Sequence, residues 1–208
     1  MSKKISESAV RRLSLYLRTL EELDRAGHAT VSSGQLAARS ATTAAQVRKD
    51  LSLFGSFGKR GLGYTVEELA RALRDILGLT QPWRVVLIGA GRIGSALLEY
   101  RGLAHRGFQI VAVLENDSSK IGREWGDSII RDVAELEQVV RDRDVQIAIL
   151  AVPVAAVQDV MDQASRAGVR GILNFAPVRL KVPEGVTVKD VNLVMELESL
   201  TFALSQGL

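Results

Sequence analysis

With 208 residues, the chain is long enough for one or two domains, and its 47% hydrophobic and 25% charged residues are typical of a globular protein. It contains no cysteine, which excludes disulfides, thiolate metal ligands and cysteine nucleophiles. No apolar run approaches the ~18 residues of a membrane span, and residues 1–12 lack the apolar segment of a secretory signal. We therefore expect a cytoplasmic protein with no membrane partner.

The net charge of +3 is unevenly distributed along the chain. Residues 1–80 carry 13 Lys and Arg against 8 Asp and Glu, whereas residues 81–208 carry 14 against 16. A basic module followed by a nearly neutral one is typical of a nucleic-acid-binding unit fused to a ligand-binding domain. Charge asymmetry of this size also arises by chance, so charge alone is weak evidence for a nucleic-acid-binding unit.

The first predicted elements are a helix over residues 8–26 and two short helices over 34–40 and 44–55, with a tight join at residues 40–41. In the first helix, leucines recur at helical spacing at Leu13, Leu17, Leu20 and Leu23. A longer helix followed by two short, closely joined helices indicates a helix-turn-helix.

Two further elements complete the first 80 residues. The glycine-rich stretch from Phe57 to Tyr64 favours a β-hairpin wing, and residues 65–78 form another amphipathic helix. Residues 79–83 read as a linker. We therefore predict a winged helix-turn-helix domain over residues 1–80.

The second helix of a helix-turn-helix places its first residues at base edges in the major groove. Gln46 can pair with adenine, and Arg48 or Lys49 with guanine or phosphate. The alternative is a solvated surface on a protein-interaction domain, but five basic residues against one acid over residues 39–60 favour double-stranded DNA. The expected DNA-binding residues are Ser32, Ser33, Thr43, Gln46, Arg48, Lys49, Lys59 and Arg60.

From residue 84 onward, strand and helix patterns alternate. Strands are predicted near residues 84–89, 109–115, 146–151, 171–175 and 186–191, and helices over 92–104, 132–141 and 155–167. Strands such as IAILAV (147–152) are apolar on both faces, as in a parallel sheet that helices cover on both sides. We predict an α/β, Rossmann-like parallel-sheet domain over residues 81–191.

The run VVLIGAGRIG, residues 85–94, is an apolar strand that leads into a G-x-G-x-x-G motif. Gly89 allows a tight turn, Gly91 lets the backbone approach a pyrophosphate, and Gly94 lets the helix pack close to the strand. The helix N-terminus then offers free N–H groups to the anion. The motif predicts a dinucleotide site formed by Gly89, Ala90, Gly91, Arg92, Ile93 and Gly94.

Glu115 follows the second strand, ~20 residues after the last glycine, where the carboxylate that binds the adenosine ribose is expected. A carboxylate there accepts from the ribose hydroxyls and repels a 2′-phosphate, which favours NADH and NAD⁺ over their phosphorylated forms. The alternative is a solvated acid at a strand end. Pro153, Asn174 and Phe175 follow later strands and are expected at the nicotinamide end.

No acid–base group accompanies this predicted cofactor site, which argues against an enzyme and leaves no catalytic residue to name. No metal site is expected either. A pocket with Phe175, Pro177 and Tyr100 nearby would disfavour the charged nicotinamide ring of NAD⁺ and would therefore prefer NADH.

The last predicted element is a helix over residues 192–206 with apolar side chains on more than one face. Such a helix requires burial on several sides, which a subunit interface or the core of its own domain can provide with equal plausibility. We treat residues 192–208 as a separate C-terminal segment.

The phrases QVRKDLSLFGSFGKRGLGY (46–64), VLIGAGRIGSAL (86–97), GILNFAP (171–177) and VNLVMELESL (191–200) resemble the Rex family of redox-sensing transcriptional repressors. The resemblance implies a homodimer with a winged helix, a Rossmann domain and a C-terminal dimerisation helix, residues 192–208, swapped into the partner. It further implies binding to palindromic operator DNA, release by NADH, and binding permitted by NAD⁺.

Arg18 and Tyr100 align with positions that the family implicates in its switch, and we place Asp190 and Asn192 beside them as candidate switch residues. Asn192 stands where the family usually has Asp, so a charge pair with Arg18 would have to come from Asp190 instead. Glu115 stands where the family more often has Asp, which keeps the carboxylate.

Two other functions remain open from the residues alone. One is a small NAD-dependent dehydrogenase with an N-terminal oligomerisation domain. The other is a Rossmann scaffold that binds no dinucleotide.

Overall fold

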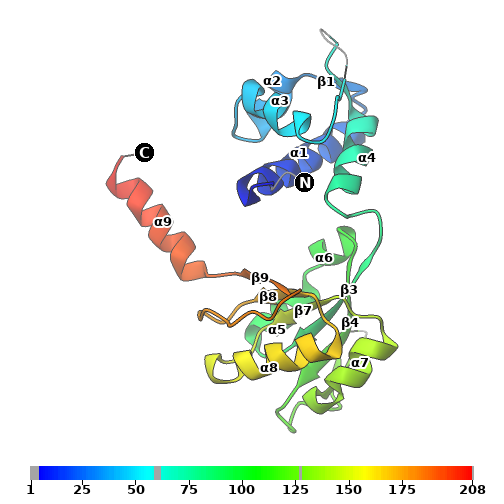
Figure 1. Ribbon diagram of the computed structural model, residues 1–208, viewed down its shortest axis with the longest axis vertical. Helices are drawn as coiled ribbons and strands as arrows, with labels where there is room; N and C mark the ends of the chain where they lie inside the picture. The colour runs from blue at the N-terminus through cyan, green and yellow to red at the C-terminus, as the bar shows by residue number, and fades with distance from the viewer. Residues whose placement is uncertain (1–4, 59–61, 127, 208) are drawn as a thin grey trace. The chain divides into compact units, whose positions relative to one another are not determined.

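The computed structural model describes residues 5–58, 62–126 and 128–207 (Figure 1). The chain divides into two compact units between Gln81 and Pro82. Each unit has its own apolar core.

The N-terminal unit is built from α1 (Glu7–Arg25), β1 (Thr30–Val31), α2 (Ser33–Arg39), α3 (Ala44–Ser52), β2 (Tyr64–Thr65) and α4 (Val66–Ile76). Its core contains the leucines of α1 that the helical spacing predicted, together with apolar residues of the other helices. Ser6 begins α1 as its N-cap by accepting a hydrogen bond from the Ala9 amide.

The helix-turn-helix is confirmed. Between α2 and α3, Ala41 adopts a φ of 48°, a left-handed conformation that turns the chain within few residues. Beside it, the hydroxyl of buried Ser40 lies 3.3 Å from that of Thr19 on α1, which ties the turn to the long helix.

The predicted hairpin over residues 57–64 is not formed as a pair of strands among the described residues. Instead, β2 pairs antiparallel with β1, with Tyr64 opposite Val31. The chain does double back, because a Cβ at Gly58 would overlap the carbonyl oxygen of Gly63. Sequence analysis missed β1 because a two-residue strand has no periodicity.

The C-terminal unit contains a seven-stranded sheet in the order β5-β6-β4-β3-β7-β8-β9. All neighbours are parallel except β5 and β6. Without β5, this is the strand order of a dinucleotide-binding Rossmann sheet. The strands are β3 (Trp83–Ile88), β4 (Phe108–Glu115), β5 (Glu124–Trp125), β6 (Ser128–Asp132), β7 (Ile147–Leu150), β8 (Gly171–Asn174) and β9 (Thr187–Asp190).

Helices cover the two faces of this sheet unequally. A short 3-10 helix (Val133–Glu135), α7 (Leu136–Asp142) and α8 (Val154–Ala167) lie along one face (Figure 1). On the other face, α5 (Arg92–Glu99) and α6 (Gly102–His105) pack over β3 and β4. The single helix predicted over residues 92–104 is wrong, because Tyr100 adopts an extended conformation that ends α5.

The face with α5 and α6 is open over β7, β8 and β9. Residues 175–186, which connect β8 to β9, contain no helix. A groove of about 330 Å³ remains there, and apolar side chains line most of it, among them Ile147, Ile149 and Leu173.

The last helix, α9 (Leu193–Ser205), confirms the predicted C-terminal helix. Its seven large apolar side chains are all between 54% and 69% exposed: Leu193, Val194, Met195, Leu197, Leu200, Phe202 and Leu204. The described residues of the C-terminal unit therefore leave α9 and the groove uncovered.

Candidate functional site

A cleft of about 730 Å³ opens at the carboxyl ends of β3, β4 and β7. From β3 the sheet order runs in opposite directions, to β4 on one side and to β7 on the other, which is the switch point where α/β sheets bind ligands. Of the expected cofactor-binding residues, the structure brings these to the cleft: Gly89, Gly91, Arg92, Ile93, Glu115 and Pro153.

The backbone conformation and the neighbouring atoms differ among the three glycines of the loop. Gly89 has a φ of 105°, and a Cβ there would overlap the carbonyl oxygen of Ala151. A Cβ at Gly94 would overlap the carbonyl oxygen of Gly89. Gly91 has an ordinary φ of −88°, and a Cβ there would meet no atom of the described chain within 4 Å.

No contact within the described chain therefore requires glycine at position 91. It lines the cleft and is the N-cap of α5, so the first amides of that helix have no side-chain acceptor. A backbone that is bare at this point lets a ligand's anionic group approach free N–H groups at the positive end of the helix dipole.

Glu115 ends β4 and is buried, with 8% of its surface exposed. Its Oε2 accepts from the Ala90 amide at 2.9 Å and from the Lys120 ammonium at 3.1 Å. Its Oε1 accepts from the amides of Asn116 and Asp117. Burial would raise the pKa of Glu115, but the hydrogen bonds from Asn116, Lys120 and Ala90 outweigh burial and hold this pKa below its usual value.

Sequence analysis missed Lys120, which also lines the cleft. Its ammonium lies 3.1 Å from Glu115 and 3.5 Å from Asp117, so this end of the cleft carries a cation as well as carboxylates. In the segment after β4, Asp117 accepts from the Ser119 amide at 3.0 Å and so begins the turn that leads to Lys120.

Besides Tyr100, four expected cofactor-binding residues do not line the cleft. Ala90 reaches Glu115 through its backbone, and Gly94 is buried against the carbonyl of Gly89. Asn174 is fully buried, donates to the carbonyl of Ala176 and to Asp190, and accepts from the Ala176 amide. Phe175 packs at the edge of the core on the α5 side of the sheet.

Tyr100 is also separate from the cleft. It is 62% exposed and lines a different hollow between α5, α6, β4 and β5. The aromatic pocket expected at the nicotinamide end is thus not assembled by the described part of one chain, where the cleft's apolar lining comes from aliphatic residues and Pro153.

The helix-turn-helix presents the second group of expected residues. Ser32 caps α2 in a capping box with Gln35, and Thr43 caps α3 by accepting from the Gln46 amide at 3.1 Å. Arg48 donates to the hydroxyl of Ser33 at 2.8 Å, which links α3 to the start of α2. Lys49 is exposed on α3, and Lys59 and Arg60 lie outside the described residues.

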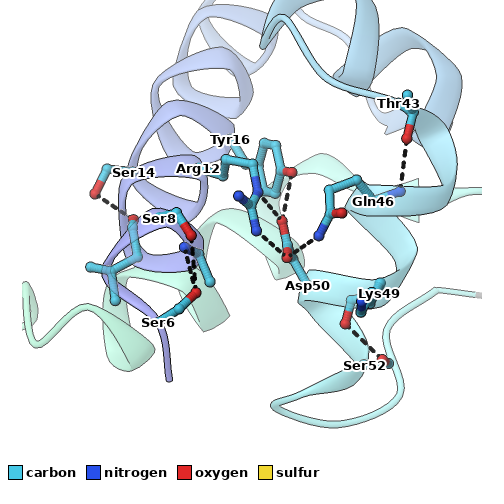
Figure 2. Close-up of polar contacts among 12 residues, drawn as sticks. Ser6, Ser8, Arg12, Ser14, Tyr16, Thr43, Gln46, Lys49, Asp50 and Ser52 are labelled. Atoms are coloured by element: carbon cyan, nitrogen blue, oxygen red, sulfur yellow. Dashed lines mark hydrogen bonds and ion pairs between the residues drawn. The ribbon is translucent and has the colours of Figure 1, made fainter. Parts of the chain in front are cut away.

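A buried carboxylate at Asp50 joins α3 to α1 (Figure 2), and sequence analysis missed it. Asp50 is 2% exposed and accepts from Arg12 through both oxygens, at 2.6 and 2.7 Å. It also accepts from the Tyr16 hydroxyl at 2.9 Å and from the Gln46 side-chain amide at 2.7 Å. We call Arg12, Tyr16, Gln46 and Asp50 the Asp50 cluster.

The pKa values in the Asp50 cluster follow from its geometry. Burial would raise the pKa of Asp50, but hydrogen bonds from Arg12, Gln46 and Tyr16 outweigh burial and hold it below its usual value. Burial and the hydrogen bond to Asp50 raise the pKa of Tyr16 to about 12. At neutral pH the cluster thus holds one carboxylate, one guanidinium and a neutral phenol.

The residues expected to form the switch occupy different elements. Arg18 is exposed on α1, and Asp190 ends β9 and accepts from Asn174 at 2.8 Å. Asn192 is the N-cap of α9, where its Oδ1 accepts from the amides of Val194 and Met195.

Comparisons with known proteins agree on a family. A family model described as "CoA binding domain" matches residues 80–178, and one described as "Putative DNA-binding protein N-terminus" matches residues 4–52. The redox-sensing transcriptional repressor Rex of Carboxydothermus hydrogenoformans is 51% identical over 96% of this chain and 96% of its own length. The Rex of Desulforamulus reducens is 48% identical over 97% of this chain and 96% of its own.

This chain belongs to the Rex family of redox-sensing transcriptional repressors.

Solved structures support the same assignment. The crystal structure of RSP with β-NAD⁺ and operator DNA is 35% identical, matches with a TM-score of 0.92, and the match covers 98% of this chain and 94% of that one. RSP with β-NADH is 33% identical, with a TM-score of 0.88 and coverage of 99% and 96%. The α/β fold with an N-terminal DNA-binding unit, predicted from the sequence, is therefore confirmed.

Two further observations concern the described residues only. They contain no group of three or more His, Cys, Asp or Glu side chains placed to hold a metal ion. Within the same ranges, no helix has the length and apolar character to cross a membrane.

Proposed function

We propose that this chain is a repressor that binds operator DNA as a homodimer through α2 and α3 and is released when NADH binds in the cleft after β3. NAD⁺ permits DNA binding. The observation that carries this proposal is that Gly91 lines a cleft at the switch point of a Rossmann sheet and has no side chain to keep a ligand away from the backbone. The same chain contains a helix-turn-helix.

The residues of the cleft fit a dinucleotide. The first amides of α5 would hold the pyrophosphate, and Glu115 with Lys120 would hold the adenosine ribose. The lining near Val152 and Pro153 is apolar and would meet the nicotinamide end. Desolvating the positive ring of NAD⁺ is costly, so an apolar wall favours neutral NADH.

Two surfaces that one chain leaves uncovered support the proposed homodimer. Helix α9 exposes seven apolar side chains, and the groove over β7, β8 and β9 lacks the helix that a doubly wound sheet would place there. We infer that α9 of a second copy is swapped onto this face. The partner would then complete the nicotinamide end near Phe175, which one chain leaves at the edge of its core.

In a dimer, DNA binding depends on the spacing between the two recognition helices. Two recognition helices read a palindrome only at one spacing, so a rotation of the subunits on NADH binding would break the match. Coupling is reciprocal, so operator DNA must weaken NADH binding by the same factor. Typical coupling free energies are ~1–3 kcal/mol.

Fluorescence anisotropy of a labelled palindromic duplex, selected from random DNA by the protein, tests this proposal at fixed salt. We expect tight binding that is lost with micromolar NADH and kept with NAD⁺. Binding indifferent to both would refute redox sensing. Failure to bind DNA together with turnover of NADH on carbonyl compounds would favour the NAD-dependent dehydrogenase, and no NADH fluorescence change would favour a scaffold that binds no dinucleotide.

A further inference from the structure

Both helices of the helix-turn-helix begin with the same sequence signature. Ser32 is followed three residues later by Gln35, and Thr43 is followed three residues later by Gln46. Each pair has the form of a capping box, in which the glutamine side chain returns to the amide of the capping residue.

The two glutamines nevertheless have different partners. Gln35 closes its box, because the Ser32 amide donates to its Oε1 at 2.9 Å while its own amide donates to the Ser32 hydroxyl. Gln46 closes only half of its box: its backbone amide donates to Thr43, but its side chain turns to Asp50 at 2.7 Å (Figure 2).

Chemistry fixes which end of the Gln46 side chain faces Asp50. The Asp50 carboxylate is held ionised by the bidentate guanidinium of Arg12, and an ionised carboxylate only accepts hydrogen bonds. The NH₂ end of Gln46 therefore points inward, and Oε1 is the end left for a ligand. Among the described residues nothing donates to that oxygen.

Asp50, the anchor of the Gln46 side chain, is held rigidly because all of its hydrogen-bonding capacity is used. Asp50 accepts four hydrogen bonds, two at each oxygen, from Arg12, Tyr16 and Gln46. A carboxylate has about four such sites, so the carboxylate is saturated. Turning Gln46 outward would leave a buried acceptor with one partner fewer, which is unfavourable.

We propose that Asp50 is a positioning residue that restricts Gln46 to reading a base through Oε1 alone. This rests on the proposed function, with α3 in the major groove. A free glutamine pairs bidentately with adenine, donating to N7 and accepting from the N6 amino group. An acceptor-only glutamine reads an exocyclic amino group, which adenine and cytosine both present, and it gains nothing from N7.

The test starts from operators selected from random duplex DNA by the wild-type chain and by Gln46→Met. We expect one base position per half-site at which the wild type selects adenine or cytosine and Gln46→Met shows no preference. Replacing adenine there by 7-deazaadenine, which lacks N7, should change wild-type affinity less than twofold. The control Gln35→Met removes the same side chain at the same position of α2 and should leave base preference unchanged.

A second arm frees Gln46 by removing its anchor. Arg12→Met/Tyr16→Phe/Asp50→Leu replaces the ion pair and phenol together, so that no buried charge is left unpaired. In this variant adenine should be preferred over cytosine by about 5- to 10-fold, and 7-deazaadenine should abolish that preference. The first arm leaves the Asp50 cluster intact apart from Gln46, so it decides the inference even if the triple variant does not fold.

Three results would overturn the inference: a 5- to 10-fold loss with 7-deazaadenine in the wild type, identical preferences in Gln46→Met and wild type, or a folded triple variant with wild-type preference. Failure to select any DNA sequence is a different outcome, because it refutes DNA binding itself and the inference with it.

Discussion

At the scale of single residues, Gly91 is the clearest link between sequence and ligand. We expect Gly91→Ala to weaken NADH binding at least tenfold, because the added methyl group would occupy space in the cleft where the proposed function places the pyrophosphate. The fold should tolerate the change, since the φ of −88° is ordinary and the new Cβ meets open space. NADH fluorescence titration and thermal unfolding measure the two effects.

Gly94→Ala is the matched control for this prediction. Its Cβ would overlap the Gly89 carbonyl, so it should lower the unfolding temperature as well as NADH affinity. If Gly91→Ala bound NADH as the wild type does, the pyrophosphate would not lie against this loop.

Glu115 supports the glycine loop through the Ala90 amide, so its charge should matter for stability. Glu115→Gln replaces an acceptor with an amide whose NH₂ group would face donors, and we expect a loss of about 1–2 kcal/mol at pH 7. The folded-state pKa lies below the usual 4.5, so this stabilisation is present above pH 4.5 and disappears as the pH falls through the lower value. Urea unfolding from pH 3 to 7 should therefore show the two proteins converging in acid, and a constant difference would contradict the assignment.

Some of these residues could be predicted from the sequence and others could not. The glycines and Glu115 follow from fixed spacings within one strand–helix–strand unit. Lys120 and Asp50 could not be found, because their roles depend on contacts that bring together a turn after β4 or two separate helices. The signature at Thr43 and Gln46 even suggests the wrong partner, since the same pattern closes a capping box at Ser32.

At the scale of elements, long periodic segments were predictable and short ones were not. The helical spacing of leucines gave α1, and the chain's alternation of apolar runs and helices gave the parallel sheet. The two-residue strands β1 and β5 have no periodicity to detect, and β6 was missed although it pairs with β4. Helix α5 ended early because of the backbone conformation at Tyr100, which no residue type there dictates.

The Asp50 cluster should make the N-terminal unit sensitive to alkali through Tyr16. Tyr16→Phe removes a hydrogen bond to a charged acceptor, so we expect a loss of about 1.5–3 kcal/mol at pH 7. The folded pKa of about 12 lies above the unfolded value of 10.0, so the contribution of Tyr16 is complete below pH 10 and is lost as the pH rises toward 12. Denaturant unfolding at pH 7 and pH 11 should show the difference shrink at the higher pH. A difference that grows or stays constant would contradict this origin.

Asn192 is the N-cap of helix α9, and the resemblance noted in the sequence implies Asp at this position. Asparagine and aspartate cap helices about equally well, so Asn192→Asp should leave α9 and the stability of the protein unchanged within ~0.5 kcal/mol. It adds a charge at the base of α9, and we expect the factor by which NADH weakens DNA binding to change several-fold. Anisotropy titrations with and without NADH measure that factor.

The control Asn192→Ala removes the cap and should lower the free energy of unfolding by ~1 kcal/mol. Equal coupling in Asn192→Asp and wild type would show that the position does not act in the switch.

At the scale of the whole molecule, the proposed function requires that α9 packs against a second copy of the chain. In one chain Leu197 and Leu204 are already 61% and 69% exposed, so replacing both with glutamate has no core to disrupt and should leave the 22.6 kDa monomer folded. In a dimer the same charges would be buried without partners, which is strongly unfavourable. We therefore expect Leu197→Glu/Leu204→Glu to elute as a monomer by light scattering, whereas the wild type has twice the monomer mass.

The same variant separates DNA binding from folding. One helix-turn-helix contacts only one half of a palindrome, so loss of the dimer should weaken operator binding at least 100-fold. The matched control Gln138→Glu/Gln163→Glu places two glutamates on exposed positions of α7 and α8 and should remain a dimer with wild-type DNA affinity.

A variant of α9 that keeps the dimer mass would place the interface elsewhere. A true monomer with wild-type operator affinity would mean that each helix-turn-helix acts alone, and a rotation between subunits could then no longer explain release by NADH.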